Sequence, residues 1–277
     1  MVRLLQIEFI ELWNNRASKV LITSYFVLLT SIALIAAIKF DIGPVKFHLA
    51  EQGIFNFPYI WHFNTFMTAI FKLFLAIVIV SMMANEYSNK TIKQNLIDGL
   101  SKKEFILSKF LTVISFAAIS TVFVFVVSMI LGLIYSDYNE LSIIFSDLEF
   151  LLAFFIKLVG FFSFCLFLGI FVKRSAFALG FLILWQIFEG FVRGMLRWKV
   201  FDGPSTDAVM AFFPLNAMFK LIDEPFTRLS AVQNVANQIG EEFELDYHVH
   251  WYEMLIVLGW TAIFIYLSYA LLKKRDL

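Results

Sequence analysis

The sequence is poor in charge and in cysteine. Charged residues make up 16% of the 277 residues, and the formal net charge is zero. A nucleic-acid-binding role therefore has no electrostatic support, since such a role needs an excess of Lys and Arg facing phosphates. The one cysteine, Cys165, lies in an apolar run, which excludes an intramolecular disulfide and predicts a buried, unreactive thiol.

Motifs for nucleotide or zinc chemistry are missing as well. The sequence contains no G-x-x-x-x-G-K-[ST] segment, which would form a P-loop, and no H-E-x-x-H segment. No nucleophile stands beside a base and an orienting group in a recognisable pattern. We therefore expect no catalytic residue and no cofactor bound by this chain. Energy for any transport then has to come from a partner or from an ion gradient.

Apolar residues, by contrast, are abundant. They make up 60% of the chain, and the mean hydropathy is +0.80. A soluble domain of this size cannot bury that much apolar surface, so the composition predicts an integral membrane protein. Phe alone accounts for 35 residues. We read them as lipid-facing and packing side chains, with an aromatic substrate path as the alternative.

Six apolar runs approach the length of roughly 20 residues that a helix needs to cross a bilayer. They predict an all-α membrane fold in a single domain, residues 1–277. The first run is too long for a signal-peptide core, so we expect it to be retained. The six runs are Val20–Ile38, Phe63–Met83, Phe110–Tyr135, Phe150–Val172, Phe177–Met195 and Tyr252–Leu272.

Basic residues indicate how these spans are oriented. They gather near both termini, in the loop of residues 85–109 and at Lys173–Arg174, whereas the connection 136–149 has none. The positive-inside rule then places both termini in the cytoplasm, and we expect the membrane to be the bacterial inner membrane. The long connection 196–251 is external. Its short apolar piece, which contains Pro214 and Asn216, predicts a re-entrant or interfacial half-helix.

Residues 1–19 have the pattern of an amphipathic helix that lies in the inner interface. Leu5, Phe9 and Trp13 fall near one helical face, and the polar residues lie largely elsewhere. The segment is either a simple membrane anchor or a docking surface that works together with the loop of residues 85–109.

This loop is short, polar and basic, and it connects two apolar runs. Its charged side chains can form ion pairs at the rim of an interface with a soluble partner, which steer association and set register. The alternative is a solvated loop that is attracted to anionic lipid. The charged residues are Lys90, Lys93, Lys102, Lys103, Lys109, Glu86, Asp98 and Glu104.

The order of residues in the loop is also informative. An acidic residue after the second span is followed by a Thr-Ile pair, a leucine, a turn-like Gly-Leu-Ser, two lysines and an apolar stretch. This pattern resembles the permease subunit of type-2 ATP-binding-cassette (ABC) transporters, although a proline that many members carry near Gly99 or Leu100 is absent. The matching residues are Glu86, Thr91, Ile92, Leu96, Gly99, Leu100, Ser101, Lys102, Lys103, Phe105, Ile106, Leu107 and Lys109.

The resemblance implies an exporter permease with six spans. It would pair with a second permease copy, identical or paralogous, and dock on cytoplasmic ATPase subunits that hold ATP and Mg²⁺. Residues 1–19 would be the connecting helix, and the substrate would be a lipid, drug or peptide. The alternatives are an ion-coupled secondary transporter and a non-transporting scaffold or sensor. The implied docking residues are Glu86, Thr91, Lys93, Leu96, Lys102 and Lys103.

Four charged residues, Lys72, Lys157, Glu189 and Arg193, fall inside apolar runs. Glu189 and Arg193 stand four residues apart on one helix and can pair, while the two lysines can extend outward to the interface. A sharper hypothesis places Glu189 on a substrate path with Lys72 or Lys157 as its counter-charge, because an unpaired charge at that depth is costly.

The four histidines, His48, His62, His248 and His250, all map to the outer side. We read them as part of an interfacial belt of aromatic and polar residues. A divalent-metal site built from His248, His250 and the acidic residues of 241–246 is the alternative, but no full ligand set has diagnostic spacing. We therefore predict no metal ligand.

Overall fold

The computed structural model describes residues 2–37, 39–42, 45–48, 53–199, 202–229, 232 and 247–275. The fold is helical, as predicted, apart from a short antiparallel hairpin that we did not predict, in which Lys39 lies opposite His48. The elements are α1 (Val2–Asn14), α2 (Arg16–Ala37), β1 (Lys39–Ile42), β2 (Val45–His48), α3 (Tyr59–Ile70), α4 (Lys72–Ser88), α5 (Thr91–Ile97), α6 (Lys102–Tyr135), α7 (Leu141–Ile144), α8 (Glu149–Val172), α9 (Ser175–Lys199), α10 (Gly203–Met210), α11 (Pro214–Lys220), the 3-10 turn η2 (Phe226–Arg228) and α13 (Trp251–Lys274).

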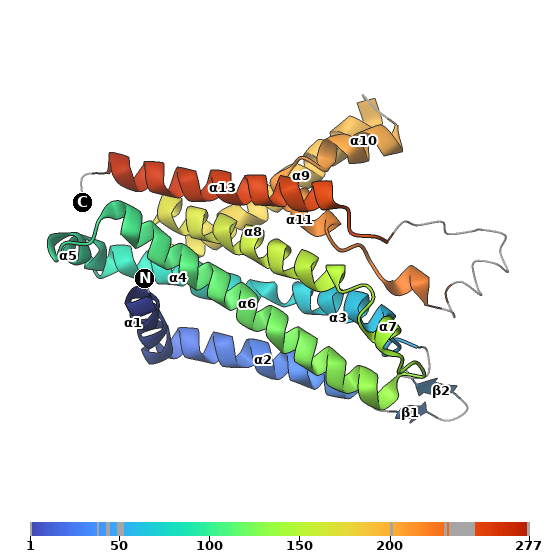
Figure 1. Cartoon of the computed structure of the whole chain (residues 1–277). Coiled ribbons are helices and arrows are strands. Elements are labelled where there is room, and N and C mark those ends of the chain that lie inside the picture. The colour runs from blue at the N-terminus through green and yellow to red at the C-terminus, as the bar shows by residue number, and fades with distance from the viewer. Residues whose placement is uncertain are drawn as a thin grey trace.

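The long helices form an elongated bundle (Figure 1). At one end lie α1, α5 and the carboxyl end of α13, and we call this the termini end. At the other lie β1, β2 and α7, and we call this the hairpin end. Both ends of the chain lie at the termini end, as expected for a chain whose termini share one side of the membrane. Helix α1 lies across the axis of α2 instead of continuing it.

Helix α8 forms the centre of the bundle. It packs against α13, α4, α6, α9 and α3. In the segment Leu141–Val172, 83% of the most apolar 18-residue stretch is buried, compared with 17% in α9. Two glycines allow neighbouring helices to come close. A Cβ at Gly169 would lie 2.9 Å from the Cβ of Met83, and a Cβ at Gly160 would lie 2.6 Å from a methyl group of Val257.

Four helices in the described ranges are long and apolar enough to cross a membrane, and the count rises to five if the bent pair α3–α4 is one span. These helices include the predicted runs from Phe110 onward. The predicted run Phe63–Met83 covers parts of two helices, α3 and α4, between which the chain bends by 44°. A span formed by this bent pair stays a prediction. At the break the Phe71 N–H donates to the carbonyl of Thr68, three residues back, which interrupts the regular i to i−4 pattern. A sixth span over α2 stays a prediction.

The segment after α9 contains two short helices. Asp202 caps α10 by accepting a hydrogen bond from the Ser205 N–H, and α11 begins at Pro214. Pro214 therefore starts a helix and does not interrupt one, as suits a residue that lacks an N–H to donate. Helix α11 packs against α13, α8 and α9. The later part of the connection 196–251, which is polar in sequence, falls mostly outside the described residues.

Candidate functional site

A buried group of charges joins three elements at the termini end. The Lys109 ammonium, on α6, donates to Glu8 on α1 over 2.7 Å and also to Glu86 on α4. The three side chains are 1%, 9% and 5% exposed. Ser108 donates a hydrogen bond of 3.0 Å to Glu8, and Thr91 at the start of α5 donates to Glu86. One cation thereby fixes α1, α4 and α6 relative to one another.

The loop that follows α4 is held in a defined shape. Lys90 and Gly99 have φ of 58° and 100°, and in this left-handed region glycine is the least strained residue. Ser101 begins α6 with a capping box: its hydroxyl accepts from the Glu104 N–H, and its own N–H donates to the Glu104 carboxylate over 2.9 Å. Such a box satisfies two backbone donors that would otherwise lack partners. The backbone on both sides of the short helix α5 therefore has a defined conformation.

Helix α5 has an inner and an outer face. Ile92 is 2% exposed, and Leu96 packs against the core. Lys93 points outward, as does Ile97, which lies one turn further on and is 75% exposed. A charged and an apolar side chain thus share the outer face of a helix at the end of the bundle.

The predicted docking residues divide into two groups. Lys93 and Lys103 are exposed. Glu86 is buried at 4% exposure, so it cannot contact a partner directly, and Thr91 is half-buried beside it. The ammonium of Lys102 donates to the carbonyl oxygens of Lys273 and Arg275 at the end of α13. Glu86, Thr91 and Lys102 therefore position the loop and do not form its outer surface.

Helix α1 is amphipathic, and the residues of its predicted apolar face have different surroundings. Phe9 packs on Phe116 with ring centroids 5.7 Å apart, and Leu5 is half-buried. Trp13 is 55% exposed and so does not belong to the inner face. The residue at the centre of that face is Glu8, because its carboxylate faces Lys109.

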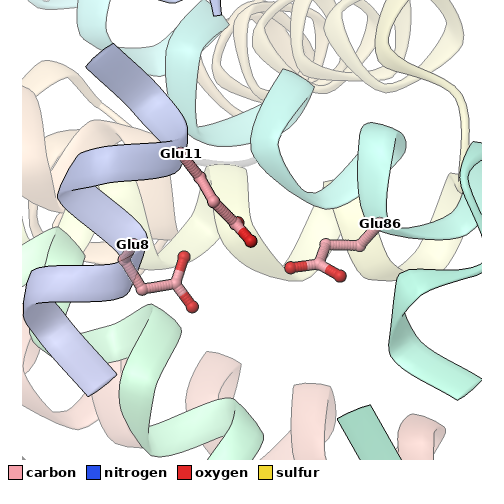
Figure 2. A group of neighbouring side chains, drawn as sticks. All are labelled: Glu8, Glu11 and Glu86. Carbon is pink, nitrogen blue, oxygen red and sulfur yellow. The ribbon is translucent and has the colours of Figure 1, made fainter. Parts of the chain in front are cut away.

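Three carboxylates converge at this point (Figure 2). Glu8 and Glu11 extend from α1 toward Glu86, and one oxygen of each lies within 4.8 Å of the others. These oxygens could hold a cation, but the Lys109 ammonium already donates to two of the three groups. Glu11 and Glu86 also line a polar pocket of about 360 Å³ between α1 and the end of α4.

The pKa of Glu11 is raised from its ordinary value. Partial burial has the largest effect; Lys109 opposes the shift, and the negative charges of Glu86 and Glu8 add to it. The folded chain thus binds this proton more tightly than the unfolded chain. Stability from Glu11 is present below its unfolded pKa and is lost as the pH rises through its folded pKa.

We expect Glu11→Gln to melt at a higher temperature than the wild type at pH 8 and at the same temperature at pH 4. A gap that grows on acidification would contradict this, and Glu140→Gln, at an exposed position outside the cluster, serves as the control.

Glu189 accepts hydrogen bonds from the first turn of α11. Its carboxylate accepts hydrogen bonds from the N–H groups of Leu215 (3.0 Å) and Asn216 (2.8 Å). It also accepts one from the indole N–H of Trp185 over 2.8 Å. The side chain is 3% exposed. Pro214 and Asn216, predicted to mark a half-helix, therefore lie where a buried carboxylate receives the first free N–H groups of that helix.

The predicted partners of Glu189 are different in the structure. In the described part of the chain no ion pair links Glu189 to Arg193, Lys72 or Lys157. Arg193 donates to the Asn216 side chain over 2.9 Å and pairs with Asp207 at 3.3 Å. Glu189 already has three backbone and indole donors, so it does not need a cation.

The prediction that the two lysines extend outward is also wrong. Lys72 and Lys157 are 4% and 2% exposed. The ammonium of Lys72 lies 4.4 Å from the ring centroid of Phe219 and 4.6 Å from that of Phe161. Lys157 donates to the carbonyl oxygen of Phe219 over 3.2 Å.

The histidines do not share one environment. His62 is fully buried, and its ring stacks on Phe150 with centroids 4.2 Å apart. Its Nε2 lies 2.9 Å from the carbonyl oxygen of Asp223, and its Nδ1 lies 3.1 Å from an Arg228 nitrogen. His62 therefore donates through Nε2 and accepts at Nδ1, as a neutral ring does. His248 lies 3.4 Å from Glu149, and the acidic residues of 241–246 lie outside the described residues.

Sequence reasoning missed Glu8 and Arg275. Glu8 stands three residues after Leu5 and four before Leu12, so an acidic residue in an apolar stripe was the available signal. Arg275 donates to the Tyr87 hydroxyl and to the carbonyl of Ile170, which ties the end of α13 to α4 and α8. Nothing in its C-terminal position distinguished it from a basic residue that only follows the positive-inside rule.

Four helices of the described residues, or five with the bent pair α3–α4, are long and apolar enough to cross a membrane, which defines the class as an integral membrane protein. The family model described as ABC-2 family transporter protein matches residues 6–277. The chain therefore belongs to the ABC-2 transporter family, whose members are membrane transport subunits that generally work with ATPase partners. No curated protein matches the sequence.

Proposed function

We propose that the chain is the permease subunit of an ABC exporter in a bacterial inner membrane, with the termini end in the cytoplasm. In this proposal it crosses the membrane six times, with α2 as the first span. It pairs with a second permease, identical or paralogous, and each permease docks on a separate ATPase that binds ATP and Mg²⁺. The substrate is hydrophobic or amphipathic, such as a lipid, drug or peptide.

The outer face of α5 is the single observation that carries the proposal. A charged and an apolar residue, Lys93 and Ile97, are exposed on a helix whose inner face is packed. Exposed Ile97 lies outside the apolar spans, where membrane lipid would not cover it. A soluble partner that receives both side chains in a cleft would bury the apolar one and steer its approach through the charged one.

The Lys109 cluster supports a coupling role for the same face. Thr91, at the start of α5, bonds to Glu86, which in turn is bound to Lys109 on α6 and through it to Glu8 on α1. Movement of α5 by a partner would therefore be passed to two further helices. This is the kind of rigid connection through which ATP-driven closure of an ATPase pair could shift the permease between two states.

The test begins with the tagged full-length chain, purified in mild detergent from its native host. We expect a stoichiometric ATPase to accompany it. The affinity of that ATPase is then measured for Lys93→Glu and Ile97→Asp. Each is expected to weaken binding by about tenfold, since a single contact residue of this kind is worth about 1–2 kcal/mol.

The control is Arg197→Glu, an equal charge reversal on exposed α9 that should leave affinity unchanged. Absence of any ATPase from the intact, purified chain would contradict the proposal. So would an ATPase that binds all three variants as tightly as the wild type. ATP-dependent movement of a substrate in vesicles would distinguish the exporter from an ion-coupled carrier and from a scaffold.

A further inference from the structure

Two lysines buried in the bundle, Lys72 and Lys157, form no ion pair with any described residue, although the Asp223 carboxylate lies close enough to Lys157 to act on it electrostatically. Lys72 makes no hydrogen bond with any described residue, and its ammonium lies beside the faces of Phe161 and Phe219. Lys157 has one acceptor, the Phe219 carbonyl oxygen. An ammonium group carries three N–H donors, so most of the donors in this pair have no acceptor among the described residues. Phe219 lies between both groups, with its centroid 4.4 Å from one ammonium and 6.0 Å from the other.

Such an arrangement is unfavourable unless an anion completes it. Charges inside a membrane protein are expensive and as a rule are paired, and an aromatic face compensates only part of the loss of water.

The surroundings indicate how an anion would arrive. Ile70 and Leu73, on either side of the break, are 54% and 50% exposed, and Phe219 is 46% exposed. An apolar surface that faces the membrane thus adjoins the two buried ammonium groups. A molecule with an apolar tail could lie along this surface and turn a charged headgroup under the Phe219 ring.

We propose that Lys72, Lys157 and Phe219 form a binding site for a phosphate group, carried by an anionic amphiphile or present as the free ion. The amphiphile form rests on the proposed function, because it would make this site the point at which an exported molecule is recognised. Both ammonium groups would donate to phosphate oxygens. Phe219, on α11, would cover the headgroup, and the start of that helix is held by Glu189.

Binding is measured on the purified full-length chain by native mass spectrometry. The probes are phosphatidylglycerol, phosphatidylcholine and inorganic phosphate. We expect phosphatidylglycerol to bind at least about tenfold more tightly than phosphatidylcholine, the weight of one charge-assisted hydrogen bond. Lys72→Met and Lys157→Met should each remove most of this preference. Lys220→Met is the matched control, because Lys220 lies on the same α11 and already pairs with Glu253 at 3.2 Å.

Melting temperatures distinguish a binding role from a structural one. Without ligand, both Met variants should melt at or above the wild-type temperature, because an unpaired buried charge is gone. Phosphatidylglycerol should then raise the melting temperature of the wild type only. Competition by inorganic phosphate would identify the free ion as a sufficient ligand. Retention of phosphatidylglycerol in excess phosphate would identify the lipid.

Equal binding of the two lipids, together with no binding of phosphate, would overturn the site. So would Met variants that bind as the wild type does or that melt well below it without ligand. These measurements need no ATPase. A chain that docks its ATPase and transports another substrate, yet shows no anion preference, would refute this site alone and leave the proposed function standing.

Discussion

Lys109→Met is expected to destabilise the chain by about 3–5 kcal/mol, the usual effect of removing one partner from a buried ion pair. The substitution would leave the carboxylates of Glu8 and Glu86 buried next to each other without their shared cation. Repulsion between them would separate α1 from α4. The measurement is thermal or denaturant unfolding of the purified chain in detergent, followed by loss of the monodisperse species.

Two comparisons make this result specific. Lys103→Met, on the same helix but exposed, should change stability by no more than about 0.5 kcal/mol. Adding Glu8→Gln and Glu86→Gln to Lys109→Met should recover much of the loss, because neutral amides can remain buried without a counter-ion. If Lys109→Met unfolds as the wild type does, the cluster does not hold these helices together.

Replacing Glu189 by Met is expected to release α11 from the bundle. Three donors, from Trp185, Leu215 and Asn216, would lose their acceptor. An unsatisfied buried donor costs about 1–3 kcal/mol, so the segment should open long before the whole chain unfolds. An Ala217→Cys reporter detects this, since position 217 is 4% exposed and the native Cys165 is fully buried.

Maleimide should label the reporter in the Glu189→Met background and leave it protected with the native Glu189. Glu189→Gln, which keeps one acceptor oxygen, should give intermediate labelling and reduced transport. Arg193→Met is the control: this residue contacts Asn216 and Asp207 but is itself half exposed, so labelling should stay low. Equal protection in all backgrounds would show that α11 does not depend on the carboxylate.

The long spans could be predicted because their evidence is local. The residues of α6, α8, α9 and α13 are apolar over enough length that no other structure can hide their backbone from lipid. The break at Phe71 could not be predicted, because neither Pro nor Gly stands there and the bend arises where α3 and α4 pack on other helices. The hairpin had a signal that our sequence reasoning missed: the turn-favouring pair Gly-Pro stands between Lys39–Ile42 and Val45–His48 in the sequence.

The sequence singles out several residues of the candidate site, but it does not predict which contacts they make. Glu86 belongs to the family pattern, yet it points inward because Lys109, a full loop later in the sequence, comes to lie against it. Lys72 and Lys157 stand on different helices, and only the fold brings both to Phe219. Contacts between residues so far apart in sequence depend on packing, which the spacing of residues within one helix does not reveal.

The length of helix α6 determines how far its two ends move when the helix tilts. Its 34 residues form one continuous helix, about 51 Å long, whereas the hydrocarbon core of a bilayer is about 30 Å thick. Its first turn belongs to the loop at the termini end, and Gly132, near its last turn, packs against Phe57 at the hairpin end. A rod of this length multiplies small rotations: a tilt of about 5° at one end displaces the other by about 4 Å. A small rotation of α6 at the termini end would thus become a lateral displacement of several ångströms at the hairpin end.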